Sequence, residues 1–130
     1  DNIYPQDYVF PVCNPDVEIT GDQEFKIGNL IIEAIHTPGH SEGSISYLIK
    51  INGKKCLFCG DVVVHGGLLM FLNCPGTTME GYRKSMPKLG NRGIEGFFPG
   101  HHCFVLNKGQ EHIDKAIEAL KHVVPPPNAL

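Results

Sequence analysis

Apolar positions in the first half of the chain predict β-strands. Residues 30–35 are almost wholly apolar, which is typical of a strand buried on both faces. Residues 44–51 alternate between apolar and polar side chains, which predicts a half-exposed strand. The apolar face of this second strand consists of Ile45, Tyr47, Ile49 and Ile51.

Residues 55–64 predict a third strand, which is interrupted at Gly60-Asp61. Gly28-Asn29 and Asn52-Gly53 have the composition of hairpin turns and separate the predicted strands. Before Gly28, several prolines and Gly21-Asp22 divide the chain into what we expect to be short β pieces.

The second half of the chain shows helical periodicity in two places. Thr77 to Glu80 has the Thr-x-x-Glu form of a capping box, and apolar residues follow at helical spacing up to Gly90. We expect Pro87 to kink or shorten this helix. The second helix carries an apolar stripe opposite charged residues, and the prolines at 125–127 end it. The stripe consists of Ile113, Ala116, Ile117, Leu120 and Val124.

The composition indicates short elements joined by many turns, since 15 Gly and 10 Pro occur in 130 residues. Together with the strand and helix patterns, it favours a mixed α/β (α+β) fold with one mixed β-sheet and two main helices. The length is enough for one hydrophobic core. We therefore expect residues 1–130 to form a single domain.

Charge and cysteine content narrow the class of protein. The net charge of −3 comes without a basic run, so we expect no nucleic-acid partner. No apolar stretch reaches the roughly 18–20 residues of a membrane span, and no signal-peptide pattern is seen, so we expect a cytoplasmic protein without membrane contact. Five cysteines without a framework spacing indicate reduced thiols. We interpret Cys56 and Cys59 as small buried hydrophobic residues rather than a reactive pair.

Three potential metal ligands each follow an apolar run at a glycine-containing turn. A strand that ends in such a turn projects its next residue from the edge of a sheet, so three turns can aim their side chains at one point. Two imidazoles and a carboxylate suit Zn, Fe or Mn. The predicted metal ligands, each with the turn that precedes it, are His40 after Pro38-Gly39, Asp61 after Gly60, and His101 after Pro99-Gly100.

The order of these motifs resembles the second half of the metallo-β-lactamase superfamily, from about Gly21 to Val124. The resemblance implies half of an αββα sandwich. It also implies that His40 ligates a first metal ion, that Asp61 bridges two ions and orients water, and that His101 completes the second ion. One or two Zn²⁺ are implied, with Fe or Mn as alternatives. The matching motifs are Thr37-Pro38-Gly39-His40, Gly60-Asp61 and Phe98-Pro99-Gly100-His101.

The His-x-His-x-Asp-His motif of that family is absent from this sequence. Because the motif belongs to the first half of the family fold, we expect the chain to be the C-terminal portion of a longer protein and to be inactive alone. Its expected partners are a small-molecule substrate and either the missing N-terminal half or a second copy of itself.

The resemblance implies a metal-dependent hydrolase of an ester, thioester or lactone, in which a metal-activated water attacks the substrate. One alternative is an iron-dependent persulfide dioxygenase that uses His40, Asp61 and a histidine from the absent half. Another alternative is a non-catalytic half-domain that binds a partner, or a second copy, through an exposed face.

The remaining histidines are assigned supporting roles. We interpret His36 as a donor that braces the turn after it, next to the metal site. His65 and His102 are candidates for lining the pocket. We expect His112 on the solvent-exposed face of the last helix. Residues 62–78 form the expected substrate-facing or lid-like segment.

Overall fold

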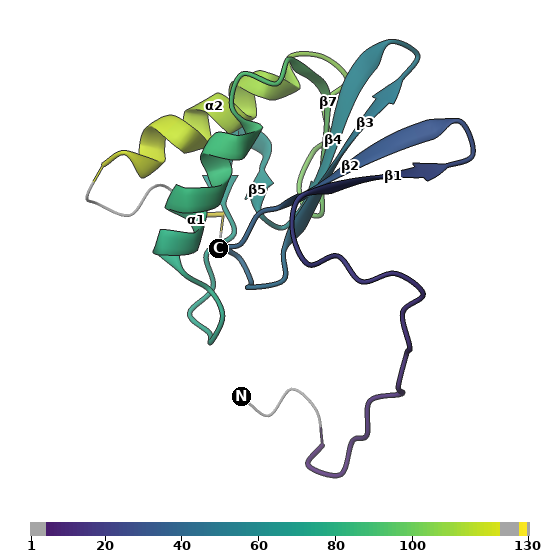
Figure 1. Ribbon diagram of the computed structural model, residues 1–130. Coiled ribbons are helices and arrows are strands. Elements are labelled where there is room, and N and C mark those ends of the chain that lie inside the picture. Colours follow the sequence, from purple (N-terminus) through teal and green to yellow (C-terminus); the bar gives the residue numbers. More distant parts are fainter. Residues whose placement is uncertain (1–4, 123–127, 130) are drawn as a thin grey trace.

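The computed structural model describes residues 5–122 and 128–129, and its main feature is one five-stranded sheet (Figure 1). The strands are β1 (Gln23–Ile27), β2 (Leu30–His36), β3 (Ile45–Ile51), β4 (Lys54–Gly60) and β7 (Ile94–Pro99). Their order across the sheet is β1-β2-β3-β4-β7. The first four strands pair antiparallel, and β7 pairs parallel with β4.

The segment between β4 and β7 contains several short elements. These are β5 (Val63–Val64), the 3₁₀-helix η1 (His65–Gly67), β6 (Leu68–Leu69), α1 (Met79–Ser85) and the 3₁₀-helix η2 (Met86–Leu89). Strands β5 and β6 pair as a separate two-stranded sheet. The last helix, α2 (Gly109–Leu120), follows β7. Among the described residues, no helix has the length and apolar character that crossing a membrane requires.

The hydrophobic core lies between the sheet and the two helices, which cover one face of it (Figure 1). Alternation along the strands turns one set of side chains toward the helices. Burying such side chains contributes roughly 1.5–3 kcal/mol each. The sheet supplies Ile35, Leu48, Leu57, Cys59 and Phe97, and the helices supply Tyr82, Met86, Leu89, Ile113, Ala116 and Leu120. This arrangement confirms the predicted mixed α/β fold.

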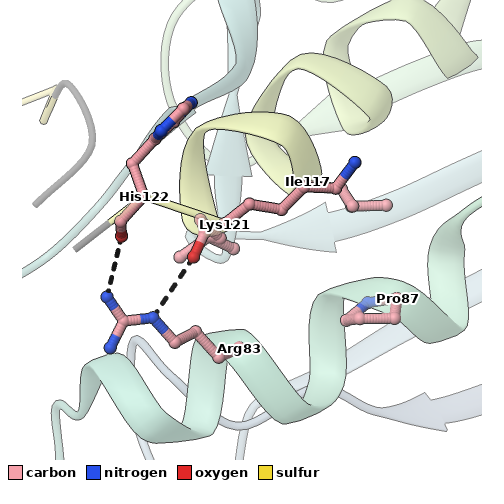
Figure 2. A pocket seen from close by; sticks show the side chains of 6 residues that line it. Arg83, Pro87, Ile117, Lys121 and His122 are labelled. Atoms are coloured by element: carbon pink, nitrogen blue, oxygen red, sulfur yellow. Dashed lines mark hydrogen bonds between the residues drawn. The ribbon is translucent and has the colours of Figure 1, made fainter. Parts of the chain in front are cut away.

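Arg83 joins the two helices (Figure 2). Its Nε donates to the carbonyl of Leu120 at 3.2 Å, and its Nη2 donates to the carbonyl of His122 at 3.1 Å. Both acceptors lie at the C-terminal end of α2, where the last helical carbonyls have no partner within the helix. The guanidinium therefore fixes α1 against α2 beside a cavity of about 470 Å³.

The burial of two strands differs from the sequence-based expectation. Leu30 and Ile31 are exposed, because the β1–β2 hairpin extends beyond the helices, so β2 is not buried on both faces along its length. In β3, Ser46 and Leu48 face the core and are buried. The alternating apolar residues Ile45, Tyr47 and Ile49 lie on the outer face and are only half-buried. Within residues 5–22 no strand forms, contrary to the expected short β pieces.

The helices follow the predicted pattern with changes at their ends. Thr78, not Thr77, is the N-cap of α1, and its side chain accepts from the N–H of Gly81 at 3.0 Å. As expected from Pro87, α1 ends early, and the chain continues as η2. The buried stripe of α2 includes Ile113, Ala116 and Leu120 as predicted. Val124 and the prolines at 125–127 lie outside the described residues.

Candidate metal centre

Three strands that run in the same direction end at one edge of the sheet. β2 and β4 are each antiparallel to β3, and β7 is parallel to β4. His40 lies in the loop after β2, Asp61 directly follows β4, and His101 follows β7. The topology therefore places all three predicted ligands at the same edge.

Asp61 lies between the two histidines. Its Oδ1 is 2.8 Å from Nδ1 of His101, and its Oδ2 is 3.9 Å from Nε2 of His40. Nδ1 of His101 donates a hydrogen bond to Oδ1 of Asp61. Each oxygen of the carboxylate thus faces a different imidazole.

A hydrogen bond from Nδ1, the ring nitrogen that does not face Asp61, orients the imidazole of His40. Nδ1 donates to the carbonyl of Met70 at 2.6 Å. A neutral imidazole that donates through Nδ1 has an unprotonated Nε2, which is the form that binds a metal ion. Such a hydrogen bond on the far ring nitrogen is the usual way in which proteins orient a metal-binding histidine.

The turn that carries His40 is fastened to the N-terminal end of α1 and to α1 itself. Three successive carbonyls accept hydrogen bonds from this region. The donors and acceptors are Ser85 Oγ to Pro38 at 2.7 Å, Thr78 N–H to Gly39 at 2.9 Å, and Thr77 Oγ1 to His40 at 2.8 Å. These contacts explain why Thr77 does not cap the helix, because its hydroxyl is used by the turn.

No three His, Cys, Asp or Glu side chains are grouped closely enough to hold a metal ion within residues 5–122 and 128–129. The side chains of His40, Asp61 and His101 nevertheless offer donor atoms of the kinds that bind a metal ion. Two ligands of one zinc ion lie at most roughly 4.3 Å apart, and His40 Nε2 and Asp61 Oδ2 meet that limit at 3.9 Å. His101 is hydrogen bonded to the carboxylate instead of being placed as a third ligand. The three-ligand site stays a prediction.

His36 is bound into the same loop as His40. Its Nε2 donates to the carbonyl of Glu42 at 2.7 Å, and its backbone N–H donates to Asp22 Oδ1 at 2.7 Å. Lys88 binds both Asp22 Oδ1 and the carbonyl of His36 at 3.0 Å. The hydrogen bond to Lys88 is the largest cause that lowers the pKa of Asp22. These contacts span the loop at the position where a bracing role for His36 was expected.

The supporting assignment of His112 differs from the structure, while those of His65 and His102 stay predictions. His112 is half-buried rather than solvent-exposed, since its ring stacks on Phe97 with centroids 5.2 Å apart. His65 is exposed and lies against His112, with ring centroids 4.6 Å apart. This position at α2 gives it no described contact with the predicted ligands. His102 is exposed and has a positive φ of 65°.

The expected lid contains core residues. Val62, Val63 and Val64 are buried, and so are Leu69 and Met70. Residues 71 to 78 are exposed or half-buried, and this part stays the candidate for a lid-like role.

The cysteines agree with the interpretation of the sequence. Cys56 and Cys59 are free and buried. Burial raises the pKa of the Cys59 thiol to about 12, which leaves it protonated and unreactive.

Sequence reasoning missed the groups that orient His40. The Met70 acceptor is a backbone carbonyl, which no side-chain motif reveals. Tyr82 was interpreted only as a core residue, although its hydroxyl donates to the same carbonyl at 3.1 Å. The available signal was the tyrosine itself, because a buried hydroxyl requires a hydrogen-bond partner.

Comparison with known proteins supports the motif assignment. A family model described as the metallo-beta-lactamase superfamily matches residues 4–107. A probable metallo-hydrolase of Bacillus subtilis, YqgX, is 44% identical over 50 residues, which cover 38% of this chain and 23% of that protein. A probable hydroxyacylglutathione hydrolase of Schizosaccharomyces pombe, glo2, is 31% identical over 83 residues, which cover 59% of this chain and 30% of that protein.

A solved structure shows the same fold. The metallo-beta-lactamase family protein of Thermus thermophilus aligns with a TM-score of 0.65 at 16% identity, over 83% of this chain and 36% of that one. The matched segments span less than a third of the two curated relatives. Because the family model covers most of the sequence, including His40, Asp61 and His101, the chain belongs to the metallo-beta-lactamase superfamily.

Proposed function

We propose that this chain carries one part of the metal centre of a hydrolase that acts on an ester, thioester or lactone. The observation that supports the proposal is the position of Asp61 between His40 and His101 at the sheet edge. In this proposal the three side chains hold one or two Zn²⁺, with Fe or Mn as alternatives.

The residues of this chain would have distinct roles in such a centre. In its neutral form His40 presents an unprotonated Nε2, because Nδ1 donates to the carbonyl of Met70. Asp61 supplies negative charge and an acceptor for the water molecule that attacks the substrate. His101 holds Oδ1 of Asp61. A bound divalent ion would supply the Lewis acidity that polarises the substrate carbonyl and lowers the pKa of water.

The curated relatives support a narrower substrate class and a missing N-terminal half as parts of this proposal. Because one of them is a probable hydroxyacylglutathione hydrolase, we favour hydrolysis of an acyl–sulfur bond within the proposed range. The matches cover 23% and 30% of the relatives' lengths. We therefore propose that the remaining ligands come from an N-terminal half and that the chain is inactive without it. The free cysteines support the further proposal that the protein works in the cytoplasm.

Native mass spectrometry with added Zn²⁺, Co²⁺ or Fe²⁺ tests the proposal. The wild-type chain should bind at least one ion, while Asp61→Asn and His40→Ala should lose it, because each removes a donor at the 3.9 Å pair. His122→Ala removes an exposed histidine at the end of α2 and should bind like the wild type. Equal binding by all four proteins contradicts the proposal, and binding of Fe²⁺ alone favours the dioxygenase alternative.

A second candidate function, partner binding, is favoured by the outer face of the sheet. Aromatic side chains cross this face on the side opposite the helices, and they contact one another. Phe25 and Tyr47 have ring centroids 6.4 Å apart, Phe58 and Phe98 stack at 4.7 Å, and Phe98 and Phe104 stack at 5.8 Å. We call these five residues the aromatic row. Phe104 is 62% exposed, and a contiguous exposed apolar patch of this kind is typical of a surface that binds another protein.

We propose that a polypeptide supplying the rest of the fold covers the aromatic row. The solved structure from Thermus thermophilus contains a further part, since only 36% of that chain is matched. Sedimentation velocity should then show that this chain is a monomer. In a separate fluorescence measurement the monomer should bind a hydrophobic dye, and Phe58→Lys should reduce the dye binding. A dimer that Phe58→Lys dissociates would instead identify a second copy as the occupant.

A further inference from the structure

Tyr82 is buried directly below the turn that carries His40. A Cβ atom on Gly39 would lie 2.5 Å from Cγ of the Tyr82 ring, so the ring packs against the backbone of Gly39. The Tyr82 hydroxyl donates to the carbonyl of Met70 at 3.1 Å. That carbonyl also accepts from Nδ1 of His40 at 2.6 Å. One backbone oxygen therefore joins the tyrosine hydroxyl to the imidazole.

The Met70 carbonyl decides which nitrogen of His40 carries the proton. While it accepts from Nδ1, the neutral ring keeps its free lone pair on Nε2, which faces Oδ2 of Asp61. If the carbonyl turned away, the Nδ1 proton would lose its partner and the opposite tautomer would be populated. That tautomer places a proton where the metal-binding lone pair is needed.

Met70 follows β6, so its carbonyl takes no part in the β5–β6 ladder, while the N–H of the same peptide unit, on Phe71, donates to Asn128 Oδ1 at 3.0 Å. The described residues supply two side-chain donors to it, from Tyr82 and His40. Tyr82 itself is held in place, because the neighbouring Arg83 binds the end of α2 (Figure 2). Burial, together with the charge of Asp61, raises the pKa of Tyr82, so its hydroxyl remains a donor.

Resting on the proposed function, we propose that Tyr82 is a positioning residue for His40. Its hydroxyl holds the Met70 carbonyl in the direction that accepts the Nδ1 proton, and this keeps Nε2 of His40 bare and aimed at Asp61. Tyr82 touches neither substrate nor metal in this role and acts through the backbone of Met70.

The ¹⁵N chemical shifts of the His40 ring, measured on the metal-free chain, test the proposal. The wild-type protein should show a protonated Nδ1 and an unprotonated Nε2. Tyr82→Phe keeps the ring that packs on Gly39 and removes only the hydroxyl, so both shifts should move toward those of mixed tautomers. Tyr47→Phe removes a hydroxyl on the outer face of the sheet, away from the turn that carries His40, and should leave both shifts unchanged.

A Co²⁺ titration followed by absorption provides a second measurement. Tyr82→Phe should raise the Kd for Co²⁺ by about tenfold, the lower end of the range for groups that orient metal ligands. Tyr47→Phe makes the same chemical change on the outer face of the sheet and should leave the Kd unchanged. If the wild-type chain binds no Co²⁺, the proposed hydrolase function fails, while a tautomer shift in Tyr82→Phe still supports the positioning role.

Two results overturn the inference. The first is an unchanged His40 tautomer in a folded Tyr82→Phe protein. The second requires no variant and therefore decides the question even if Tyr82→Phe does not fold. It is a wild-type spectrum of the neutral His40 ring in which Nε2, and not Nδ1, carries the proton.

Discussion

Gly100 packs so closely against the Asp61 carboxylate that residue 100 has no room for a Cβ atom. A Cβ atom on Gly100 would overlap Oδ1 of Asp61 and would lie 3.2 Å from the carbonyl carbon of Gly60. The N–H of Gly100 donates to the carbonyl of Gly60 at 2.8 Å, which holds the two turns together. The backbone after β7 can approach the carboxylate this closely because residue 100 has no side chain.

Gly100→Ala is expected to displace the Asp61 carboxylate. The added methyl group should lower the free energy of unfolding by about 1–3 kcal/mol and weaken Co²⁺ binding by at least about tenfold. Urea unfolding and Co²⁺ titration measure the two effects. Gly43→Ala is the matched control, because nothing lies within 4 Å of the position of its Cβ. Wild-type Co²⁺ binding by Gly100→Ala would contradict the prediction.

The five cysteines should fall into two groups by reactivity. Cys13, Cys74 and Cys103 are exposed, so a thiol reagent should modify them in the native protein. Cys56 and Cys59 are buried, and the raised pKa of Cys59, about 12, keeps it protonated. Mass spectrometry after native labelling should therefore find three modified cysteines, and five after denaturation in urea. Native labelling of Cys59 would show that the core opens at β4.

Stability should decrease in mild acid because of His112. Burial is the main cause that lowers its pKa from 6.5, and the charges of His65 and Lys115 act in the same direction, against Glu111. The unfolded chain therefore binds a proton at a higher pH than the folded chain does, so the free energy of unfolding falls below about pH 6.5. The fall should level off below the folded-state pKa. Protonation would also break the hydrogen bond that Gly66 N–H donates to Nδ1 at 2.9 Å.

Urea unfolding at several pH values between about 7.5 and 5 measures the His112 effect. His112→Gln should show a flatter dependence than the wild type over this range. His122→Gln changes an exposed histidine near the end of the same helix and should retain the wild-type slope. Identical slopes in all three proteins would exclude His112 as the source.

The two faces of the sheet should respond differently to truncation. Leu57 is fully buried between the sheet and the helices, so Leu57→Ala should cost about 2–5 kcal/mol of unfolding free energy through the cavity that it leaves. Phe104 lies on the outer face, and Phe104→Ala should cost less than about 1 kcal/mol in the isolated chain. Chemical denaturation of both variants provides the comparison. A large cost at Phe104 would indicate that the outer face is already covered.

The sequence was sufficient to place the turns that carry the three predicted ligands at one sheet edge. Glycine turns after strand-like runs are local signals, and His40, Asp61 and His101 all lie where those signals put them. The turn sequences Gly28-Asn29 and Asn52-Gly53 are also local signals, and each connects two paired strands as predicted. Local chemistry was therefore a reliable guide to these elements.

Features that depend on distant contacts were not predicted. The face of β3 that carries Ser46 and Leu48 is turned toward the core and buried, although the outward face is the more apolar one along the sequence. His112 is half-buried because Phe97 lies beside it. The role of Thr77 follows from the carbonyl of His40, which is 37 residues away in sequence. None of these partners is visible in a local window of sequence.

The parallel pairing of β4 with β7 has a consequence for the order in which this chain folds. Strands β1 to β4 are joined by short connections, so their pairing closes short loops. Pairing β7 with β4 requires closure of the whole segment 61–93, which costs more chain entropy and is slower. Asp61 and His101 meet only when this last pairing is made. We therefore expect the sheet edge that carries His40, Asp61 and His101 to assemble in the final folding phase, after strands β1 to β4 have paired.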